Sequence, residues 1–116
     1  MTSGPVVLLD GDLLARGRLQ EATHAKGLDL RIIGSAAGAG ELRNLDPSMV
    51  VVDLDNGRER ALALVEEARL AGLDAPVIGF FSHVDRALET AAEAAGVRAI
   101  RRGRFWAKLP EVLDEG

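Results

Sequence analysis

Short apolar runs alternate along the chain with longer stretches that have helical periodicity. The runs are four to six residues long and rich in Val, Ile and Leu, which predicts strands buried on both faces of a sheet. We predict strands at residues 5–9, 28–33, 50–53, 77–81 and 97–100. The second run carries Asp29 and Arg31, and this greater polarity is typical of an edge strand.

The stretches between the strands predict amphipathic helices. The clearest is residues 58–71, where Ala61, Leu64, Val65 and Ala68 share one face and the charged residues lie off it. Further helices are expected at residues 13–26 and 41–45. Another is expected to begin after an N-cap at Ser82 or Asp85 and to end at residue 95, and a last one spans 105–113 with Pro110 in a first turn. Asp12 is an expected N-cap, and Gly27, Gly72 and Gly96 are expected to end helices.

Strands that alternate with helices through short connections predict a parallel sheet covered on both faces. With five strands and right-handed crossovers, we expect one doubly wound α/β domain over residues 1–116, with the flavodoxin-like strand order 2-1-3-4-5.

Composition narrows the functional classes. The chain has 116 residues, 47% of them hydrophobic, a net charge of −4 and no cysteine. A mildly acidic chain has no general affinity for nucleic acid or anionic membrane. No signal peptide or membrane-length apolar run is seen, so we expect a cytoplasmic protein without membrane or nucleic-acid partners.

Carboxylates follow two of the predicted strands. Asp10 and Asp12 come after the first, and Asp53 and Asp55 end the third. Because the carboxyl ends of parallel strands meet at one edge of a sheet, we expect these four acids to form a site there. Mg²⁺ is the cation that such oxygen ligands suit.

The order of these features resembles the receiver domain of two-component response regulators over nearly the full chain. Asp10-Gly11-Asp12 is similar to that family's metal-binding acidic turn, and Val51-Val52-Asp53 to its phospho-accepting strand. Pro76-Val77-Ile78 and Ala94-Ala95-Gly96-Val97 match its usual spacing around the fourth and fifth strands. The resemblance implies a signalling module without enzymatic activity, with Asp53 as the candidate phosphoryl acceptor.

The chain departs from that family at the positions that support phosphorylation. Gly11 stands where the second metal-binding acid is expected, and Phe81, followed by Ser82, where a hydroxyl is expected. The expected lysine is replaced in the Gly103-Arg104 segment. Arg101 or Arg102 is a candidate replacement, and strand alternation lets only one of them point inward. We therefore expect an atypical receiver that acts independently of phosphorylation and requires no cofactor.

A basic and aromatic cluster follows the last strand and is the candidate partner surface: Arg101, Arg102, Arg104, Phe105 and Trp106. Arginine and tryptophan are frequent anchors of protein interfaces. In the resembled family this region is the usual surface for protein partners and dimers. The expected partner is a protein, or a second copy of the chain.

Three other interpretations remain open from the sequence. The first is a working receiver that accepts a phosphoryl group on Asp53 with Mg²⁺ bound. The second is a small-ligand sensor at the carboxyl edge that uses the glycine-rich loop at residues 34–40. The third takes Asp10 and Asp12 as nucleophile and acid/base of a haloacid-dehalogenase-type phosphatase. The short chain, with no convincing lysine or closing acidic pair, disfavours the third.

Overall fold

The computed structural model describes residues 4–115 except 35, 37, 57 and 84. Ser35 and Ala37 of the glycine-rich loop, and Gly57 of the turn after the third strand, therefore lie outside the described residues.

The strands form one parallel five-stranded sheet in the predicted order, β2-β1-β3-β4-β5. They are β1 (Val6–Leu9), β2 (Leu30–Ile33), β3 (Met49–Asp53), β4 (Val77–Phe81) and β5 (Arg98–Arg101). Every residue of β1, β3 and β4 is buried, whereas the edge strands β2 and β5 are partly exposed. The predicted α/β fold and the polar second edge strand are confirmed.

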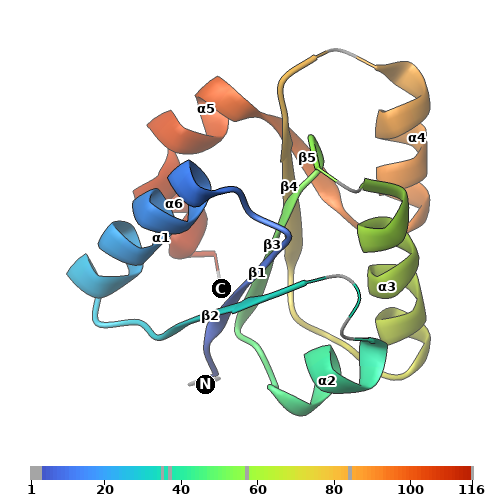
Figure 1. The fold of residues 1–116 in the computed structure, drawn as a ribbon, viewed down its shortest axis with the longest axis horizontal. Coiled ribbons are helices and arrows are strands. Elements are labelled where there is room, and N and C mark those ends of the chain that lie inside the picture. The colour runs from blue at the N-terminus through green and yellow to red at the C-terminus, as the bar shows by residue number, and fades with distance from the viewer. Residues whose placement is uncertain (1–3, 35, 37, 57, 84, 116) are drawn as a thin grey trace.

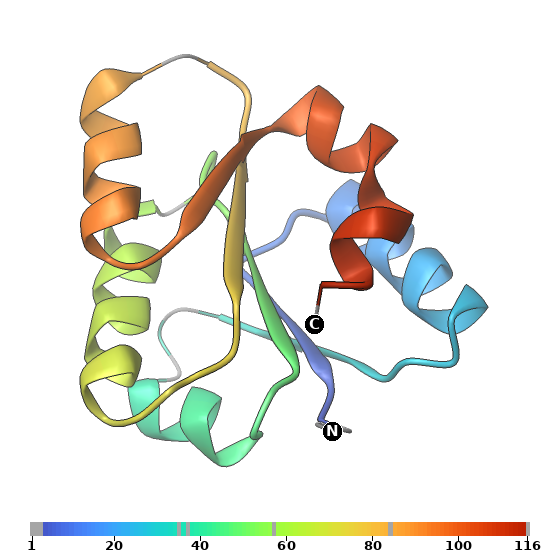
Figure 2. The ribbon, with the colours of Figure 1, turned by 180° about the vertical axis from the view of Figure 1, so that it is seen from behind.

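The helices cover the sheet in two layers, seen on opposite sides of the sheet in Figures 1 and 2. On one side lie α1 (Leu13–Ala25), α5 (Arg102–Ala107) and α6 (Leu109–Leu113). On the other lie α2 (Ala39–Asn44), α3 (Arg58–Leu70) and α4 (Arg86–Ala94). This two-sided cover explains why the central strands are apolar at every position rather than at every second one.

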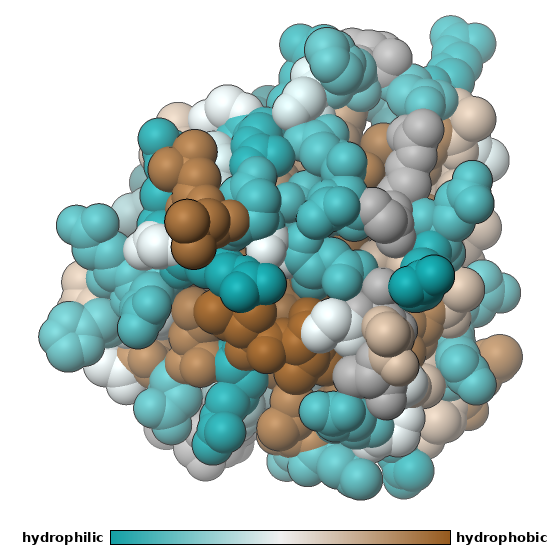
Figure 3. Space-filling view, viewed as in Figure 1, coloured by the Kyte–Doolittle hydropathy of each residue, from teal (hydrophilic) through white to brown (hydrophobic). Residues whose placement is uncertain are grey.

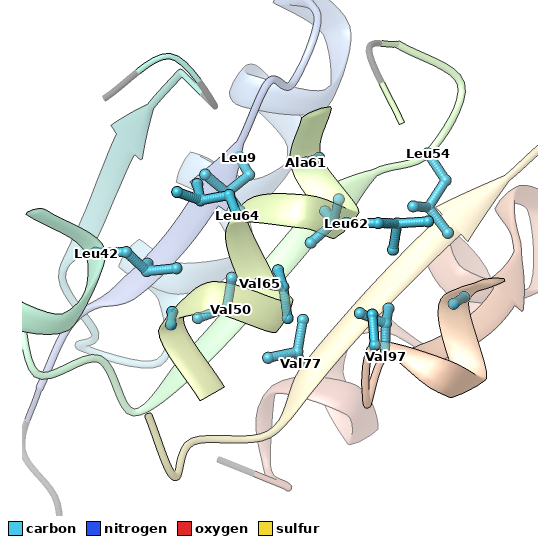
Figure 4. Close-up of a cluster of buried hydrophobic side chains, with 14 of the residues drawn as sticks. Leu9, Leu42, Val50, Leu54, Ala61, Leu62, Leu64, Val65, Val77 and Val97 are labelled. Carbon is cyan, nitrogen blue, oxygen red and sulfur yellow. The ribbon is translucent and has the colours of Figure 1, made fainter. Parts of the chain in front are cut away.

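Successive side chains along each strand point to opposite faces of the sheet and fill two separate cores. The first core lies under α2, α3 and α4, and the second lies under α1, α5 and α6. Val50 and Val77 point toward α2, α3 and α4, where Leu42, Leu64 and Val65 meet them (Figure 4). Val52 belongs to the same cluster. Val51, Ile78 and Phe80 point to the other side, against residues of α1, α5 and α6. The predicted apolar stripe of α3 is the face that enters the first core.

Helix ends follow the predicted signals, with one correction. The Asp12 side chain accepts a hydrogen bond from the Ala15 N–H at 2.8 Å, and Asp85, not Ser82, caps α4. Gly27, Gly72 and Gly96 follow their helices with positive φ, as helix-ending glycines do. The single tail helix predicted for 105–113 is wrong, because the chain forms α5 from Arg102 and then α6, with Pro110 in the first turn of α6.

Within the described residues, no helix is long and apolar enough to cross a membrane.

Candidate functional site

The four predicted acids lie at the carboxyl edge of the sheet. Asp53 is the last residue of β3, and its side chain is 1% exposed. Asp10 follows β1 with a φ of +59°, a left-handed conformation that aspartate tolerates better than most residues. The Asn56 side chain donates to the Asp10 carbonyl at 3.1 Å, which ties the loop after β1 to the loop after β3.

Arg102 brings three of these acids together. Its Nη1 donates to Asp55 Oδ2 at 2.8 Å, and its Nη2 donates to Asp12 Oδ2 at 3.0 Å. Nη1 also lies 3.9 Å from Asp53 Oδ1. The guanidinium carbon lies over the Phe80 ring, 4.9 Å from its centre, and this cation–π contact stabilises the charged group. Of the two candidate arginines, Arg102 is therefore the one that points inward, whereas Arg101 is exposed.

Asp55 is fixed from a second direction by Ser82. The Ser82 hydroxyl donates to Asp55 Oδ2 at 2.7 Å, and the Ser82 N–H donates to Oδ1 at 2.9 Å. Partial burial would raise the pKa of Asp55, but the hydrogen bonds from Ser82 and Arg102 outweigh it and lower the pKa. The Ala15 N–H and Arg102 similarly lower the pKa of Asp12. Both carboxylates are held in the ionised form by their partners.

Asp53 differs electrostatically from these two neighbours. Burial raises its pKa above the ordinary value, and the Asp55 N–H and the Arg102 charge offset this only in part. The Asp55 N–H donates to Asp53 Oδ1 at 3.0 Å, while Oδ2 is buried without a hydrogen-bond partner among the described residues. The candidate phosphoryl acceptor is thus a buried carboxyl that is costly to ionise.

The structure explains why an acid is missing at position 11. A Cβ on Gly11 would lie 2.3 Å from the Leu8 Cδ2 atom, closer than any real contact. Leu8 is wholly buried in the second core, so its side chain has no room to move away. In this conformation the turn has no place for a second metal-binding carboxylate at position 11.

The other atypical positions also have defined surroundings. Phe81 is buried in the core on the α3 and α4 side, so its ring faces away from the acids. The adjacent hydroxyl, on Ser82, is engaged by Asp55. Gly103 is exposed, and a Cβ there would meet nothing within 4 Å. Space for a longer side chain therefore exists at position 103, and the cation that serves the acids comes from the residue before it.

The arrangement of the acids suits a guanidinium better than a metal ion. Mg²⁺ takes oxygen ligands at about 2.0–2.1 Å in a near-octahedral shell. Here Arg102 already uses oxygens of Asp12 and Asp55, and a guanidinium offers its donors in a planar fork. Among the described residues, no group of three or more acidic, histidine or cysteine side chains is arranged to hold a metal. These residues therefore do not fit Mg²⁺ as they stand.

The predicted basic and aromatic cluster divides into buried and exposed members. Phe105 is wholly buried and stacks on Phe80 with ring centres 5.0 Å apart, so its assignment to the partner surface is wrong. Trp106 is half-buried, its ring edge-on to Phe105 and covered by Arg18. Arg101 and Arg104 are exposed. A shallow cavity of about 570 Å³ is lined by Ser82, Arg101, Arg102, Gly103, Arg104 and Trp106.

Sequence reasoning missed the polar contacts that hold the site together. The Ser82 bond to Asp55 and the Asn56 bond to Asp10 join loops distant in sequence, as does the Arg102 bridge. The Arg16 Nε atom also donates to the Gly11 carbonyl at 2.9 Å. Polar residues after each strand were the available signal, but their pairing depends on strand order and register.

Comparison with solved structures defines the fold. The CheY-like protein TadZ from Pseudomonas aeruginosa is 24% identical, with a TM-score of 0.78, over 97% of this chain and 99% of that chain. A response regulator from Thermotoga maritima is 22% identical, with a TM-score of 0.76, over 97% and 96%. A pilus assembly-related protein from Burkholderia pseudomallei is 16% identical, with a TM-score of 0.67, over 98% and 90%.

No family model matches the sequence, and no curated protein does. At these identities the structural comparisons establish one conclusion, which is that the chain has the fold of response-regulator receiver domains.

Proposed function

We propose that the chain is a receiver-like regulatory module, without enzymatic activity, that binds a protein partner independently of phosphorylation. The observation that carries the proposal is the Arg102 guanidinium, which hydrogen-bonds Asp55 and Asp12 and lies 3.9 Å from Asp53. In the resembled family the acids at this edge hold a metal ion. Here the Arg102 side chain contacts them instead.

The charges at the acidic site support the proposal that it needs neither a phosphoryl group nor a metal ion. A phosphoryl group on Asp53 would place up to two negative charges next to Asp12 and Asp55, where the ionised Asp53 carboxylate has one. Arg102 is the one cation whose contacts with these acids are described, and both of its donating Nη atoms are engaged. We therefore propose that neither phosphorylation nor Mg²⁺ is required for the active conformation.

The proposed contact surface consists of Arg101, Arg104 and the exposed part of Trp106. Arg104 and Trp106 lie on α5, which follows β5 directly, and the three residues border the shallow cavity beside Ser82. Two exposed arginines next to an aromatic side chain favour a partner segment that carries carboxylates. Arg102, the first residue of α5, hydrogen-bonds Asp12 and Asp55 and so fixes the start of this helix against the acids.

The competing function is a working receiver phosphorylated on Asp53. It is favoured by one observation, the buried Asp53 Oδ2 atom that lacks a hydrogen-bond partner among the described residues. Against it stand the raised pKa of Asp53, the Phe81 side chain turned into the core and the absence of room for an acid at position 11.

The interaction is tested by purifying a tagged chain from its own cells and quantifying co-purified proteins by mass spectrometry. We expect the same partners with the parent chain and with Asp53→Asn, and their loss with the Arg101→Ala/Arg104→Ala double variant. Arg60→Ala, an exposed arginine of α3 across the sheet, is the matched control and should leave binding unchanged. Unaltered recovery with the double variant, or loss with Asp53→Asn, would contradict the proposal.

A further inference from the structure

The outer edge of β2 is open. β2 pairs with β1 on one side, and no strand in the described part of the chain pairs with its other side. In Figure 1, β2 lies in front of the rest of the sheet, and Figure 3, from the same direction, shows hydrophobic surface over this region. An exposed strand edge is a template for pairing with another strand.

The backbone groups that face this open edge can be identified. The Asp29 carbonyl accepts from the Val6 N–H at 2.9 Å, and the Ile33 carbonyl accepts from the Asp10 N–H at 3.1 Å. Backbone groups alternate in direction along a strand, so those of residues 29, 31 and 33 face β1. The N–H and C=O groups of Leu30 and Ile32 therefore point outward.

The side chains of this strand also divide by face. Leu30 pairs with Val6 and Ile32 with Leu8, on the side covered by α1, where Leu30 is half-buried and Ile32 is 39% exposed. Leu28 packs on the same core. Asp29 and Arg31 are exposed on the other face, and within the described residues neither forms an ion pair.

We propose that β2 is a homodimerisation edge, at which a second copy of this chain pairs antiparallel through a two-fold axis at Leu30. In this register Leu30 faces the partner copy's Leu30, and the outward N–H and C=O groups of the two residues bond each other. Asp29 faces Arg31 of the second copy, twice, and Leu28 faces Ile32, twice. The Ile32 N–H donates to the Leu28 carbonyl of the other copy. The Leu28 N–H is not available for this pairing, because it already donates to the Thr23 carbonyl of its own chain.

Charge selects this register over its neighbours. An axis at Arg31 would place the two Arg31 side chains opposite each other, and an axis at Asp29 would place the two Asp29 side chains opposite each other. Like charges directly opposite destabilise a strand pair, whereas opposite charges stabilise it. The sequence Leu28-Asp29-Leu30-Arg31-Ile32 is thus self-complementary in one antiparallel register. An isologous two-fold contact of this kind closes as a dimer and does not extend.

The short length of β2 determines how tightly the two copies are expected to bind each other. β2 has four residues, and a contact this small buries less than the roughly 1,200–2,000 Å² of stable interfaces. We therefore expect a reversible dimer whose population depends on protein concentration.

Sedimentation velocity over a concentration series, from micromolar to millimolar, tests the proposal. We expect concentration-dependent dimerisation of the parent chain. Arg31→Asp and Asp29→Arg, each at an exposed position, create like-charge pairs and should each weaken dimerisation by about tenfold. The double variant Asp29→Arg/Arg31→Asp restores opposite pairs in the same register and should restore the parent dimer. Circular dichroism spectra and thermal midpoints like those of the parent would show that all three variants are folded.

Three results would overturn the proposal. The first is a parent chain that stays monomeric throughout the series. The second is a dimer indifferent to both single substitutions, or one that the double variant fails to restore. The third is a dimer lost with Arg101→Ala/Arg104→Ala instead, which would place self-association on the other edge of the sheet.

Discussion

At the scale of single residues, Arg102 is the side chain that hydrogen-bonds two of the carboxylates a metal ion would need. Replacing Arg102 by Met keeps an unbranched side chain but removes the guanidinium, and with it the hydrogen bonds to Asp12 and Asp55 and the contact with the Phe80 ring. We expect the free energy of unfolding to fall by about 1–3 kcal/mol, since the lost hydrogen bonds are charged but partly exposed to solvent.

The same variant should also respond to Mg²⁺. With the guanidinium gone, the acids repel one another, so added Mg²⁺ should raise the thermal midpoint of Arg102→Met more than that of the parent. Differential scanning fluorimetry measures both effects, and Arg104→Met, at an exposed arginine two residues away, is the control. Equal midpoints for the parent and Arg102→Met, with no difference in response to Mg²⁺, would show that the bridge contributes nothing.

Asp53 and Asp55 should affect stability with opposite signs. The pKa of Asp53 is raised, so the folded state binds more protons than the unfolded state between the ordinary value of 3.8 and the raised one. Stability therefore falls as pH rises through this interval, and Asp53→Asn should be more stable than the parent at neutral pH and similar below pH 3.8. The pKa of Asp55 is lowered, so its contribution is present above 3.8 and is lost as pH falls through the lowered value. Asp55→Asn should thus be less stable than the parent at neutral pH.

Urea unfolding of both variants across the pH range measures these differences. A stability loss for Asp53→Asn at neutral pH would mean that the charge on Asp53 is more strongly compensated than its buried position indicates.

The sequence predicted where the site lies but not which side chains contact each other within it. Strand-end acids indicated a site, and alternation indicated that only one of Arg101 and Arg102 could face it. Which one does so depends on where β5 ends and α5 begins, at Arg101 and Arg102. The same boundary turns Phe105 into the core and away from the partner surface to which the sequence assigned it.

At the scale of elements, α5 is held by an aromatic group that links it to β4. Phe80 and Phe105 are both wholly buried, and Trp106 touches both rings with centres 5.2 and 4.9 Å away. We expect Phe105→Ala to cost about 3–5 kcal/mol, as buried aromatic truncations do. Trp106→Ala should cost clearly less, because Trp106 is only partly buried. Equal losses in chemical unfolding would contradict this division between a core residue and a surface residue.

Strand positions were predictable because buried apolar runs and helix-ending glycines mark them locally. The tail was not, because Pro110 permits both a first helical turn and a break. The chain makes the break before it, at Lys108, the C-cap of α5.

At the scale of the whole molecule, the two edges of the sheet have different proposed roles. β5 and α5 carry the arginine and tryptophan surface, and β2 lies at the opposite edge. A dimer through β2 would leave both partner surfaces free, so the pair could bind two sites of one assembly with higher avidity than a single chain. The strand order that permits this arrangement was predictable, since right-handed crossovers leave few alternatives for five strands.

The measurement that tests the central claim most directly is intact mass spectrometry after incubation with acetyl phosphate and Mg²⁺, paired with Trp106 fluorescence in beryllofluoride. Beryllofluoride stands in for the phosphoryl group on Asp53, and Trp106 lies four residues beyond the arginine that contacts the acids. We expect neither a mass increase nor a saturable fluorescence change in the folded parent chain. A phosphoryl adduct with a matching fluorescence change, both lost in Asp53→Asn, would show a working acceptor and contradict the account.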